Sequence, residues 1–372
     1  MKPTHIIAET SIPYLRGVIE QLGRVTYLPS EDFTPKSISD ADWLIIRSIT
    51  KCHRSLLQDS QVQLITTATI GFDHIDTEYC EREGIHWVNA PGCNAEAVGQ
   101  YFGASLALLH KETGFQTKGK TLGIIGVGHV GKVVERYGRA LGMKILLNDP
   151  PRARKEGEAG FTSIQKIAEE SDIITFHVPL TREGQDATYH LCNKELINSL
   201  KKKPILINAC RGGVTNTQAL LWGLEQGLID KVIIDCWENE PMISDELLQN
   251  AWLGTPHIAG FSKQGKANGA RKCVEEGIRF FKLKSDADQK MYPTPPENPL
   301  LHLHSTDNPL MDAMMQTLNL REVDTLLRSG QYDFEALRRG YNLPHEPSSY
   351  TLIQGQIGYD EEAARLIGFN IR

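Results

Sequence analysis

Three polar side chains follow apolar runs in the middle of the chain: Arg211, Glu240 and His257. Histidine titrates near neutral pH, so it can both take up and release a proton at a reacting hydroxyl group. The planar guanidinium of an arginine binds a carboxylate through two parallel hydrogen bonds. A glutamate paired with the imidazole favours the protonated ring and fixes its tautomer. These residue types suit the oxidation of a 2-hydroxy acid by hydride transfer to a nicotinamide.

Each member of this set has a structural alternative when it is taken alone. The histidine can be a loop residue whose hydrogen bonds are all made within the protein. The arginine can cap a strand end, and Glu240 can be an exposed carboxylate beside Glu238. All three nevertheless lie in loops marked by glycine or proline, at or just beyond the carboxyl ends of predicted strands. Open α/β sheets bind their ligands at such ends, which favours an active site.

A glycine-rich stretch upstream predicts the cofactor. Residues 121–149 have the order strand, turn, helix and strand, and the turn has the spacing GxGxxG at Gly126, Gly128 and Gly131. In a dinucleotide-binding βαβ unit these glycines permit a tight turn, the close approach of a pyrophosphate and the packing of helix on strand. The helix N-terminus then offers free N–H groups to the phosphates.

Asp149 ends the second strand of this unit and favours NAD over NADP. It lies about 20 residues beyond the glycines, where a carboxylate binds the adenosine ribose hydroxyls and repels a 2′-phosphate. Arg152 and Arg154 follow closely. We expect these arginines to be exposed or near the adenosine edge, because Pro150 and Pro151 carry the chain away. The sequence therefore predicts NAD as the cofactor.

Short apolar runs alternate with helical segments, which predicts an α/β fold with parallel sheets. We expect two doubly wound parallel-sheet (Rossmann-like) domains with a cleft between them, and a small C-terminal α/β domain that serves association. The substrate-binding domain comprises residues 1–94 and 265–285, the NAD-binding domain residues 95–264, and the C-terminal domain residues 286–372. The proline-rich stretch 286–299 is the linker before the last domain.

The same patterns predict the individual elements. Strands are expected at residues 5–8, 25–28, 43–47, 64–67, 85–89, 122–125, 144–147, 173–178, 205–210, 231–236 and 349–353. Helices are expected at residues 13–22, 76–83, 95–110, 194–200, 217–226, 265–283, 311–328, 334–339 and 360–367, and a polar loop at 150–160.

The composition argues against several function classes. The formal net charge of −6 over 372 residues gives no basic footprint for nucleic acid or an anionic membrane. No apolar run approaches the roughly 20 residues that span a bilayer, and the first residues contain no signal-peptide core. Seven cysteines without CxxC spacing indicate reduced thiols in a cytoplasmic protein and argue against a metal site.

Four motifs carry a resemblance to a known family. They are the glycine turn 126–131, Asn-Ala-Cys-Arg-Gly-Gly at 208–213, Asp-Cys-Trp-Glu-Asn-Glu-Pro at 235–241 and Thr-Pro-His-Ile-Ala-Gly at 255–260. In this order they resemble the D-isomer-specific 2-hydroxyacid dehydrogenases. The resemblance implies that Arg211 binds substrate, that Glu240 orients the histidine, and that His257 donates and accepts the proton. The residues assigned to the cofactor are Gly126, Gly128, His129, Val130, Gly131, Asp149, His177, Val178, Pro179, Ala209, Cys210, Asp235 and Gly260.

Two loops in the first domain suit a phosphate or carboxylate. One loop holds Arg47, Ser48, Thr50 and Lys51, and the next strand is followed by residues 67–71, which include two threonines and a glycine. Hydroxyls, a cation and glycine-permitted backbone N–H groups are what such an anion site requires. Taken singly, either cation fits a solvated surface charge equally well, so the argument rests on the pair of loops.

Narrower sequence features, among them residues 47–51, 67–76 and 148–152, are similar to one branch of this family. That similarity implies a phosphorylated 2-hydroxy acid as substrate and a homodimer formed through the C-terminal domain. It further implies that Ser48, Thr69 and the residue after Gly260 contact substrate. This last residue is commonly tyrosine but is Phe261 here, so one hydroxyl is missing. The residues assigned to substrate are Arg47, Ser48, Thr69, Gly71 and Phe261.

Two other functions remain open from the sequence. The chain can be another D-2-hydroxyacid dehydrogenase, for example one that acts on 3-phosphoglycerate. It can also be a binding protein that senses NAD and NADH without catalysis. The complete set of arginine, glutamate and histidine argues against the sensing protein.

Overall fold

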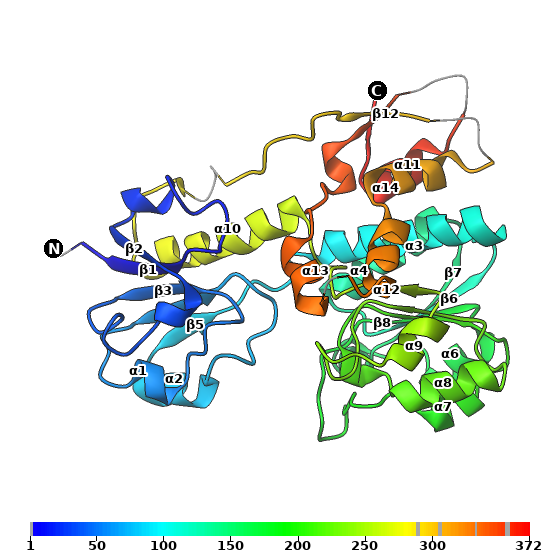
Figure 1. The fold of residues 1–372 in the computed structure, drawn as a ribbon, viewed down its shortest axis with the longest axis horizontal. Helices are drawn as coiled ribbons and strands as arrows, with labels where there is room; N and C mark the ends of the chain where they lie inside the picture. The colour runs from blue at the N-terminus through cyan, green and yellow to red at the C-terminus, as the bar shows by residue number, and fades with distance from the viewer. Residues whose placement is uncertain (1–2, 288–290, 304–306, 332, 354–357) are drawn as a thin grey trace. The chain divides into compact units, whose positions relative to one another are not determined.

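The computed structural model describes residues 3–287, 291–303, 307–331, 333–353 and 358–372. The chain forms two compact units (Figure 1), the first comprising Met1–Asn94 with Ser262–Pro295 and the second Ala95–Phe261 with Pro296–Arg372. The C-terminal residues thus group with the glycine-rich stretch, and the division into three domains stays a prediction. Part of the expected linker, residues 288–290, lies outside the described residues.

The first unit is built on a five-stranded parallel sheet in the order β2-β1-β3-β4-β5. Its strands are β1 (His5–Glu9), β2 (Arg24–Leu28), β3 (Trp43–Ile46), β4 (Leu64–Thr67) and β5 (His86–Val88). Its helices are α1 (Arg54–Leu57), α2 (Thr77–Glu83) and α10 (Lys263–Phe280). Strands β1, β3 and β4 are buried along their whole length, because elements cover both faces of a parallel sheet.

The expected helix at residues 13–22 is wrong. Only a short 3₁₀ turn, Ile19–Gln21, forms there. Tyr14 and Gly17 have φ angles of 68° and 80°, and such left-handed residues interrupt a right-handed helix.

The second unit contains a six-stranded parallel sheet in the order β11-β10-β9-β8-β6-β7. Its strands are β6 (Thr121–Ile125), β7 (Lys144–Asn148), β8 (Ile173–Phe176), β9 (Ile205–Asn208), β10 (Lys231–Ile234) and β11 (Leu253–Gly254). The chain runs from β6 outward to β7 and then returns to the other side of β6 as β8. The crevice beyond the carboxyl ends of β6 and β8 is therefore the place where such a sheet binds a ligand.

Helices cover both faces of this sheet (Figure 1). Helices α3 (Ala95–Thr113) and α4 (His129–Ala140) lie on one face. The other face carries α6 (Ile164–Glu170), α7 (Lys194–Asn198), α8 (Thr217–Glu225) and α9 (Asp245–Asn250). Helices α3 and α4 pack closely, since a Cβ on Gly99 would lie 2.4 Å from the side chain of Val133.

The expected polar loop at residues 150–160 is wrong in its first half, which forms α5 (Pro150–Glu156). The Asp149 carboxylate accepts a hydrogen bond of 3.0 Å from the Arg152 N–H and so caps the helix. Proline is well suited to the first helical position, because its fixed φ matches the helix and its missing N–H would be unpaired there anyway.

The C-terminal segment packs onto the second unit. It has a three-stranded parallel sheet of β12 (Leu300–His302), β13 (Thr351–Ile353) and β14 (Asn370–Ile371). Its helices are α11 (Pro309–Thr317), α12 (Leu320–Arg328), α13 (Phe334–Gly340) and α14 (Glu361–Ile367). Helix α11 contacts α3 and α14 contacts α4, and apolar residues of this segment share one core with the six-stranded sheet.

The expected single helix at residues 311–328 is two helices, α11 and α12. Leu318 is extended, and the side chain of Asn319 caps the N-terminus of α12. The α/β fold class with parallel sheets is confirmed. Within the described residues, no helix is long and apolar enough to cross a membrane.

Candidate active site

His257 and Glu240 are in direct contact. The imidazole Nδ1 lies 2.7 Å from Glu240 Oε2, and the two side chains are 26% and 19% exposed. The second glutamate oxygen, Oε1, accepts a hydrogen bond of 2.6 Å from the Trp237 N–H, which fixes the carboxylate on its own loop. A carboxylate at Nδ1 selects the tautomer in which Nε2 is the nitrogen that exchanges a proton with a ligand.

Asp235 holds the loop that carries His257. This buried carboxylate, directly after β10, accepts hydrogen bonds from the Thr255 hydroxyl at 2.7 Å and from the N–H groups of Ile258 and Ala259 at 2.7 and 3.0 Å. Burial raises the pKa of the Asp235 carboxyl, although the charge of His257 and these donors act in the opposite direction. The histidine has a left-handed φ of 55°, a conformation that the surrounding bonds must maintain.

Arg211 lies on the neighbouring loop, after β9. A Cβ on Gly212 would lie 1.7 Å from the Trp237 carbonyl oxygen, so only glycine allows this loop to approach the one that carries Glu240. The Arg211 guanidinium donates to the Cys210 carbonyl at 2.7 Å. The structure thus brings the three loops to one edge of the sheet and joins Glu240 to His257 directly. The catalytic roles of the three residues stay predictions.

The glycine-rich turn has the form that a pyrophosphate needs. Gly126 has a φ of 90°, and a Cβ on Gly131 would lie 2.1 Å from the Gly126 carbonyl oxygen. A Cβ on Gly128 would meet nothing within 4 Å, so the space above this residue is open. Helix α4 begins here, and none of the side chains that the structure describes caps its N-terminus. An open space beside uncapped N–H groups fits the phosphates of a dinucleotide.

Asp149 and Arg152 hold this turn from two sides. Asp149 Oδ2 accepts from the Val127 N–H at 2.8 Å, and the Arg152 Nη1 donates to the Val127 carbonyl at 2.6 Å. Both Asp149 oxygens therefore accept a backbone N–H group. Arg152 stays beside Asp149 and the glycine turn, so its expected place near the adenosine edge stays a prediction, whereas Arg154 is partly exposed and pairs with Asp186.

The remaining cofactor candidates lie along the carboxyl edge of the same sheet. His177 follows β8; burial lowers the pKa of its imidazole to about 3. Its Nδ1 is buried without a hydrogen-bond partner among the residues that the structure describes. The Val178 side chain would lie 2.7 Å from a Cβ on Gly126. His129 is exposed at the start of α4, and the other candidates are partly buried or exposed: Val130, Pro179, Ala209 and Gly260.

Burial raises the pKa of both cysteine thiols near the site, Cys210 and Cys236. Burial raises the pKa of the Cys210 thiol to about 11, which favours the structural interpretation, since the thiolate is the reactive form. Cys236, Glu240 and His257 offer ligand atoms within 4.8 Å of one another. Burial and the neighbouring Asp235 raise the pKa of the Cys236 thiol well above its usual value, which opposes metal binding through its thiolate.

A buried carboxylate that the sequence reasoning missed orders residues 47–51, the first of the two loops predicted to bind an anion. Glu9, at the end of β1, accepts from the Arg47 N–H at 3.0 Å and from the Thr50 hydroxyl at 2.9 Å. The Arg47 guanidinium donates to Ser11 at 3.2 Å, and Ser48 is exposed beside it. The sequence signal was a carboxylate directly after the apolar run at residues 6–8.

The second anion loop is also ordered within the first unit. The Thr69 hydroxyl lies 2.7 Å from that of Thr67 and donates to the Gly71 carbonyl at 2.9 Å. His74 Nε2 lies 3.0 Å from the Thr67 hydroxyl, and burial, aided by the charge of Lys51, lowers the pKa of this imidazole to about 4. The histidine is therefore neutral at physiological pH.

Phe261, the last of the substrate candidates, belongs to the second unit. Its ring centroid lies 6.5 Å from that of Tyr341, and the Arg338 guanidinium lies 5.7 Å from the Phe261 ring centroid.

Comparison with known proteins identifies the family. The family model described as the NAD-binding domain of D-isomer-specific 2-hydroxyacid dehydrogenases matches residues 103–259. An erythronate-4-phosphate dehydrogenase of Porphyromonas gingivalis is 46% identical over 364 residues, which are 97% of this chain and 98% of the relative. The chain belongs to the D-isomer-specific 2-hydroxyacid dehydrogenase family. Another relative with the same name, from Shigella dysenteriae, is 38% identical over 98% of both chains.

Solved structures of similar proteins agree with this assignment. A D-lactate dehydrogenase of Aquifex aeolicus, complexed with NAD and lactic acid, is 25% identical with a TM-score of 0.58 and covers 78% of this chain and 100% of its own. A 3-phosphoglycerate dehydrogenase of Entamoeba histolytica with bound NAD⁺ is 26% identical with a TM-score of 0.61, over 75% and 96% of the two chains. NAD is the cofactor of this family domain, as the glycine-rich unit predicted.

Proposed function

We propose that the protein oxidises the C2 hydroxyl of 4-phospho-D-erythronate to 3-hydroxy-2-oxo-4-phosphooxybutanoate with NAD, as a step of pyridoxal 5′-phosphate (vitamin B6) biosynthesis. The relatives that carry the name erythronate-4-phosphate dehydrogenase are similar over nearly their whole length. The observation that carries the catalytic part is the 2.7 Å contact between His257 and Glu240 beyond the dinucleotide-binding sheet.

The proposed mechanism assigns one task to each side chain. NAD, when bound, supplies the nicotinamide ring that takes up the hydride from C2. His257 Nε2 accepts the proton of the C2 hydroxyl, so that the C2–O bond becomes a carbonyl. Glu240 keeps the imidazole in position and stabilises the charge that it acquires. Arg211 binds the substrate carboxylate through its guanidinium.

We further propose that the two anion loops of the first unit bind the remainder of the substrate. Arg47 and Ser48 on one loop, and Thr69 and Gly71 on the other, offer a cation, hydroxyls and backbone N–H groups suited to a phosphate. Glu9 supports this assignment, because it fixes the backbone of the first loop. Phe261 contributes an apolar contact instead of the hydroxyl that is common in the family.

The assembly and location are proposed as a homodimer, formed through the C-terminal segment, in the cytoplasm. Leu300 and Leu326 of this segment are 43% and 36% exposed, which suits an interface. The cysteines are free thiols, five of them buried, which suits a reducing compartment. Light scattering of the purified protein tests the dimer.

A substrate panel tests the proposed activity. Wild-type protein is incubated with NAD and either 4-phospho-D-erythronate, 3-phospho-D-glycerate or D-lactate, and NADH formation is followed by absorbance. We expect the first acid to be oxidised with the highest kcat/KM. Faster oxidation of 3-phosphoglycerate would favour the other dehydrogenase, and NAD binding without turnover of any acid would favour a sensing protein.

A further inference from the structure

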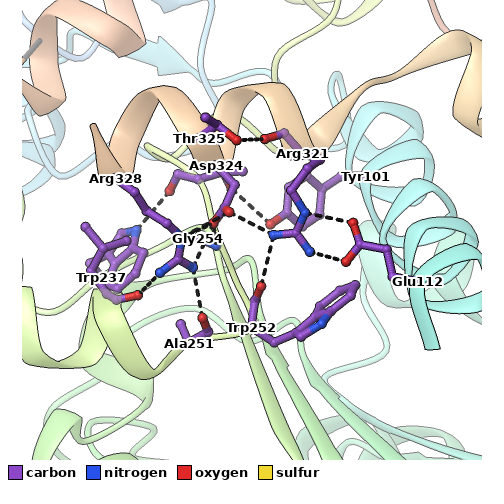
Figure 2. Close-up of polar contacts among 12 residues, drawn as sticks. Tyr101, Glu112, Trp237, Ala251, Trp252, Gly254, Arg321, Asp324, Thr325 and Arg328 are labelled. Atoms are coloured by element: carbon purple, nitrogen blue, oxygen red, sulfur yellow. Dashed lines mark hydrogen bonds and ion pairs between the residues drawn. The ribbon is translucent and has the colours of Figure 1, made fainter. Parts of the chain in front are cut away.

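Helix α12 of the C-terminal segment carries a buried carboxylate, Asp324, whose side chain is only 3% exposed (Figure 2). Arg321 Nη1 donates to it at 2.8 Å, and Arg328 Nε lies 2.9 and 3.0 Å from its two oxygens. The same carboxylate accepts a hydrogen bond of 2.7 Å from the Gly254 N–H of β11. A buried charge with this many donors is strongly fixed in place.

The two arginines connect Asp324 to the surrounding elements of the second unit (Figure 2). Arg328 donates to the carbonyls of Leu248 and Ala251 at the end of α9. Arg321 donates to the Trp252 carbonyl at 3.2 Å and forms a two-pronged ion pair with Glu112 of α3 at 2.9 and 2.5 Å. Helix α12 is thus joined to the chain immediately before and within β11.

The peptide that Asp324 holds leads directly into the catalytic loop. Gly254 is followed by Thr255, Pro256 and His257. The Thr255 hydroxyl contacts the Tyr101 hydroxyl at 2.9 Å and Asp235 at 2.7 Å. Asp324 therefore anchors the beginning of the loop, and Asp235 anchors the residues before and after His257.

Packing alone does not fix this loop on every side. Pro256 lines a cavity of about 530 Å³, which is otherwise bounded by α12, α13 and the residues that follow α11 and α13. Next to open space, directed hydrogen bonds are the contacts that keep a loop residue in a left-handed conformation.

We propose that Asp324, supported by Arg321 and Arg328, is a positioning residue for the catalytic histidine. It fixes Gly254, and so keeps His257 against Glu240 without touching substrate or cofactor. This inference rests on the proposed function, because it assumes that His257 is the base. The C-terminal segment then has a part in catalysis in addition to any role in association.

Asp324→Asn tests the inference with little change in shape, because the amide cannot neutralise two guanidinium groups. We expect kcat to fall about ten- to a hundred-fold, because a small displacement of a catalytic group causes losses of this size. KM should change less than kcat. The primary isotope effect with C2-deuterated substrate should rise as hydride transfer becomes rate-limiting. Amide hydrogen exchange of residues 253–261 should become faster. Thr325→Ala, an exposed change one residue away, should leave all four measurements unchanged.

The outcomes separate this inference from the proposed function. A kcat within two-fold of wild type with unchanged exchange, or a loss of activity in proportion to loss of folded protein with an unchanged isotope effect, would overturn the positioning role. If wild type oxidised none of the acids, the proposed function would fail, yet hydrogen exchange would still show whether Asp324 holds the loop. Should Asp324→Asn not fold, Arg321→Met removes one partner and is expected to shift the same measurements less.

Discussion

Two histidine–glutamate pairs share one loop of this protein, and they differ in what surrounds them. Glu240 contacts His257 at 2.7 Å, and Glu238, two residues earlier, contacts His190 at 2.5 Å. Both imidazoles are 26% exposed, and both histidines have left-handed φ angles, 55° and 53°. Contact distance and exposure therefore cannot distinguish the proposed catalytic pair from the other pair.

The second nitrogen of each ring makes the distinction. His190 Nδ1 lies 3.3 Å from the Asn216 amide, and its ring stacks on Tyr189 at 3.9 Å, so both of its nitrogens are used within the protein. Glu238 also caps α8 through the Thr217 N–H. His257, by contrast, follows β11, the strand next to β10, and contacts Glu240 through Nδ1, which leaves Nε2 for the proposed proton transfer. The second ring nitrogen, and not the paired carboxylate, therefore distinguishes the proposed catalytic pair from the other pair.

The largest expected effect comes from His257→Asn. Loss of the proposed general base should lower kcat about 10²- to 10⁴-fold, while the dissociation constant for NADH changes little. Stopped-flow turnover and NADH fluorescence titration measure the two quantities. The matched control is His190→Asn, which should keep kcat within a few-fold. Survival of activity in the first variant, or an equal loss in the control, would break the comparison.

Glu240→Gln should have the next largest effect. The amide leaves the shape unchanged but cannot stabilise the protonated ring. We therefore expect kcat to fall about a hundred-fold, which is the lower limit of the usual contribution of an acid–base group. Steady-state assays with saturating NAD measure the loss. Unchanged turnover would mean that Glu240 is as structural as Glu238.

The sequence predicted most of the strands and the glycine-rich turn, because both depend on local patterns, but it missed the short strands β11, β12 and β14. Buried strands need apolar runs, and a pyrophosphate turn needs glycines at fixed spacing. Two of the elements that were wrong depend on where a helix begins. Pro150 starts a helix instead of leading the chain away, and Asn319 starts a new helix within what periodicity presents as one.

Long-range polar contacts could not be predicted in this way. Asp324 and Gly254 are 70 residues apart, and nothing in either segment specifies the other. One signal was nevertheless present: Asp324 lies between Leu320 and Leu327 on the same helical face, where a charged residue indicates a buried partner. Glu9 gave a similar signal at the end of an apolar strand.

Asp149→Ala tests whether a third carboxylate has a functional role, as proposed for Glu240, or only a structural one, as proposed for Glu238. Both of its oxygens already accept backbone N–H groups, yet each can accept a further bond from ribose. We expect the preference for NAD over NADP, measured as the ratio of kcat/KM values, to fall about ten-fold. Such a fall corresponds to roughly 1.4 kcal/mol for the lost contact between the carboxylate and the ribose.

Ser163→Ala is the control for Asp149→Ala, because it removes a helix cap from the same unit without touching the turn. Its ratio should equal that of wild type. An unchanged ratio in Asp149→Ala would remove this residue from cofactor recognition and leave it a purely structural cap.

Glu238→Gln should give the smallest effect, on stability and not on turnover. Burial alone would raise the pKa of the Glu238 carboxyl, but the Thr217 N–H and His190 outweigh it and lower that pKa below its usual 4.5. A carboxyl with a lowered folded-state pKa stabilises the fold above its unfolded-state pKa, and this contribution is lost as the pH falls through the folded-state value. At neutral pH we expect a loss of about 1 kcal/mol, typical of a weakened helix cap.

Urea unfolding of wild type and Glu238→Gln across the acid range measures this effect. The difference between the two proteins should be full at neutral pH and should shrink below pH 4.5, where the carboxyl of the unfolded wild-type chain takes up its proton. A difference that stays constant with pH would mean that the shape of Glu238 matters and its charge does not. A fall in kcat as large as that of Glu240→Gln would instead place both pairs in catalysis, because a purely structural pair has no route to the reacting hydroxyl.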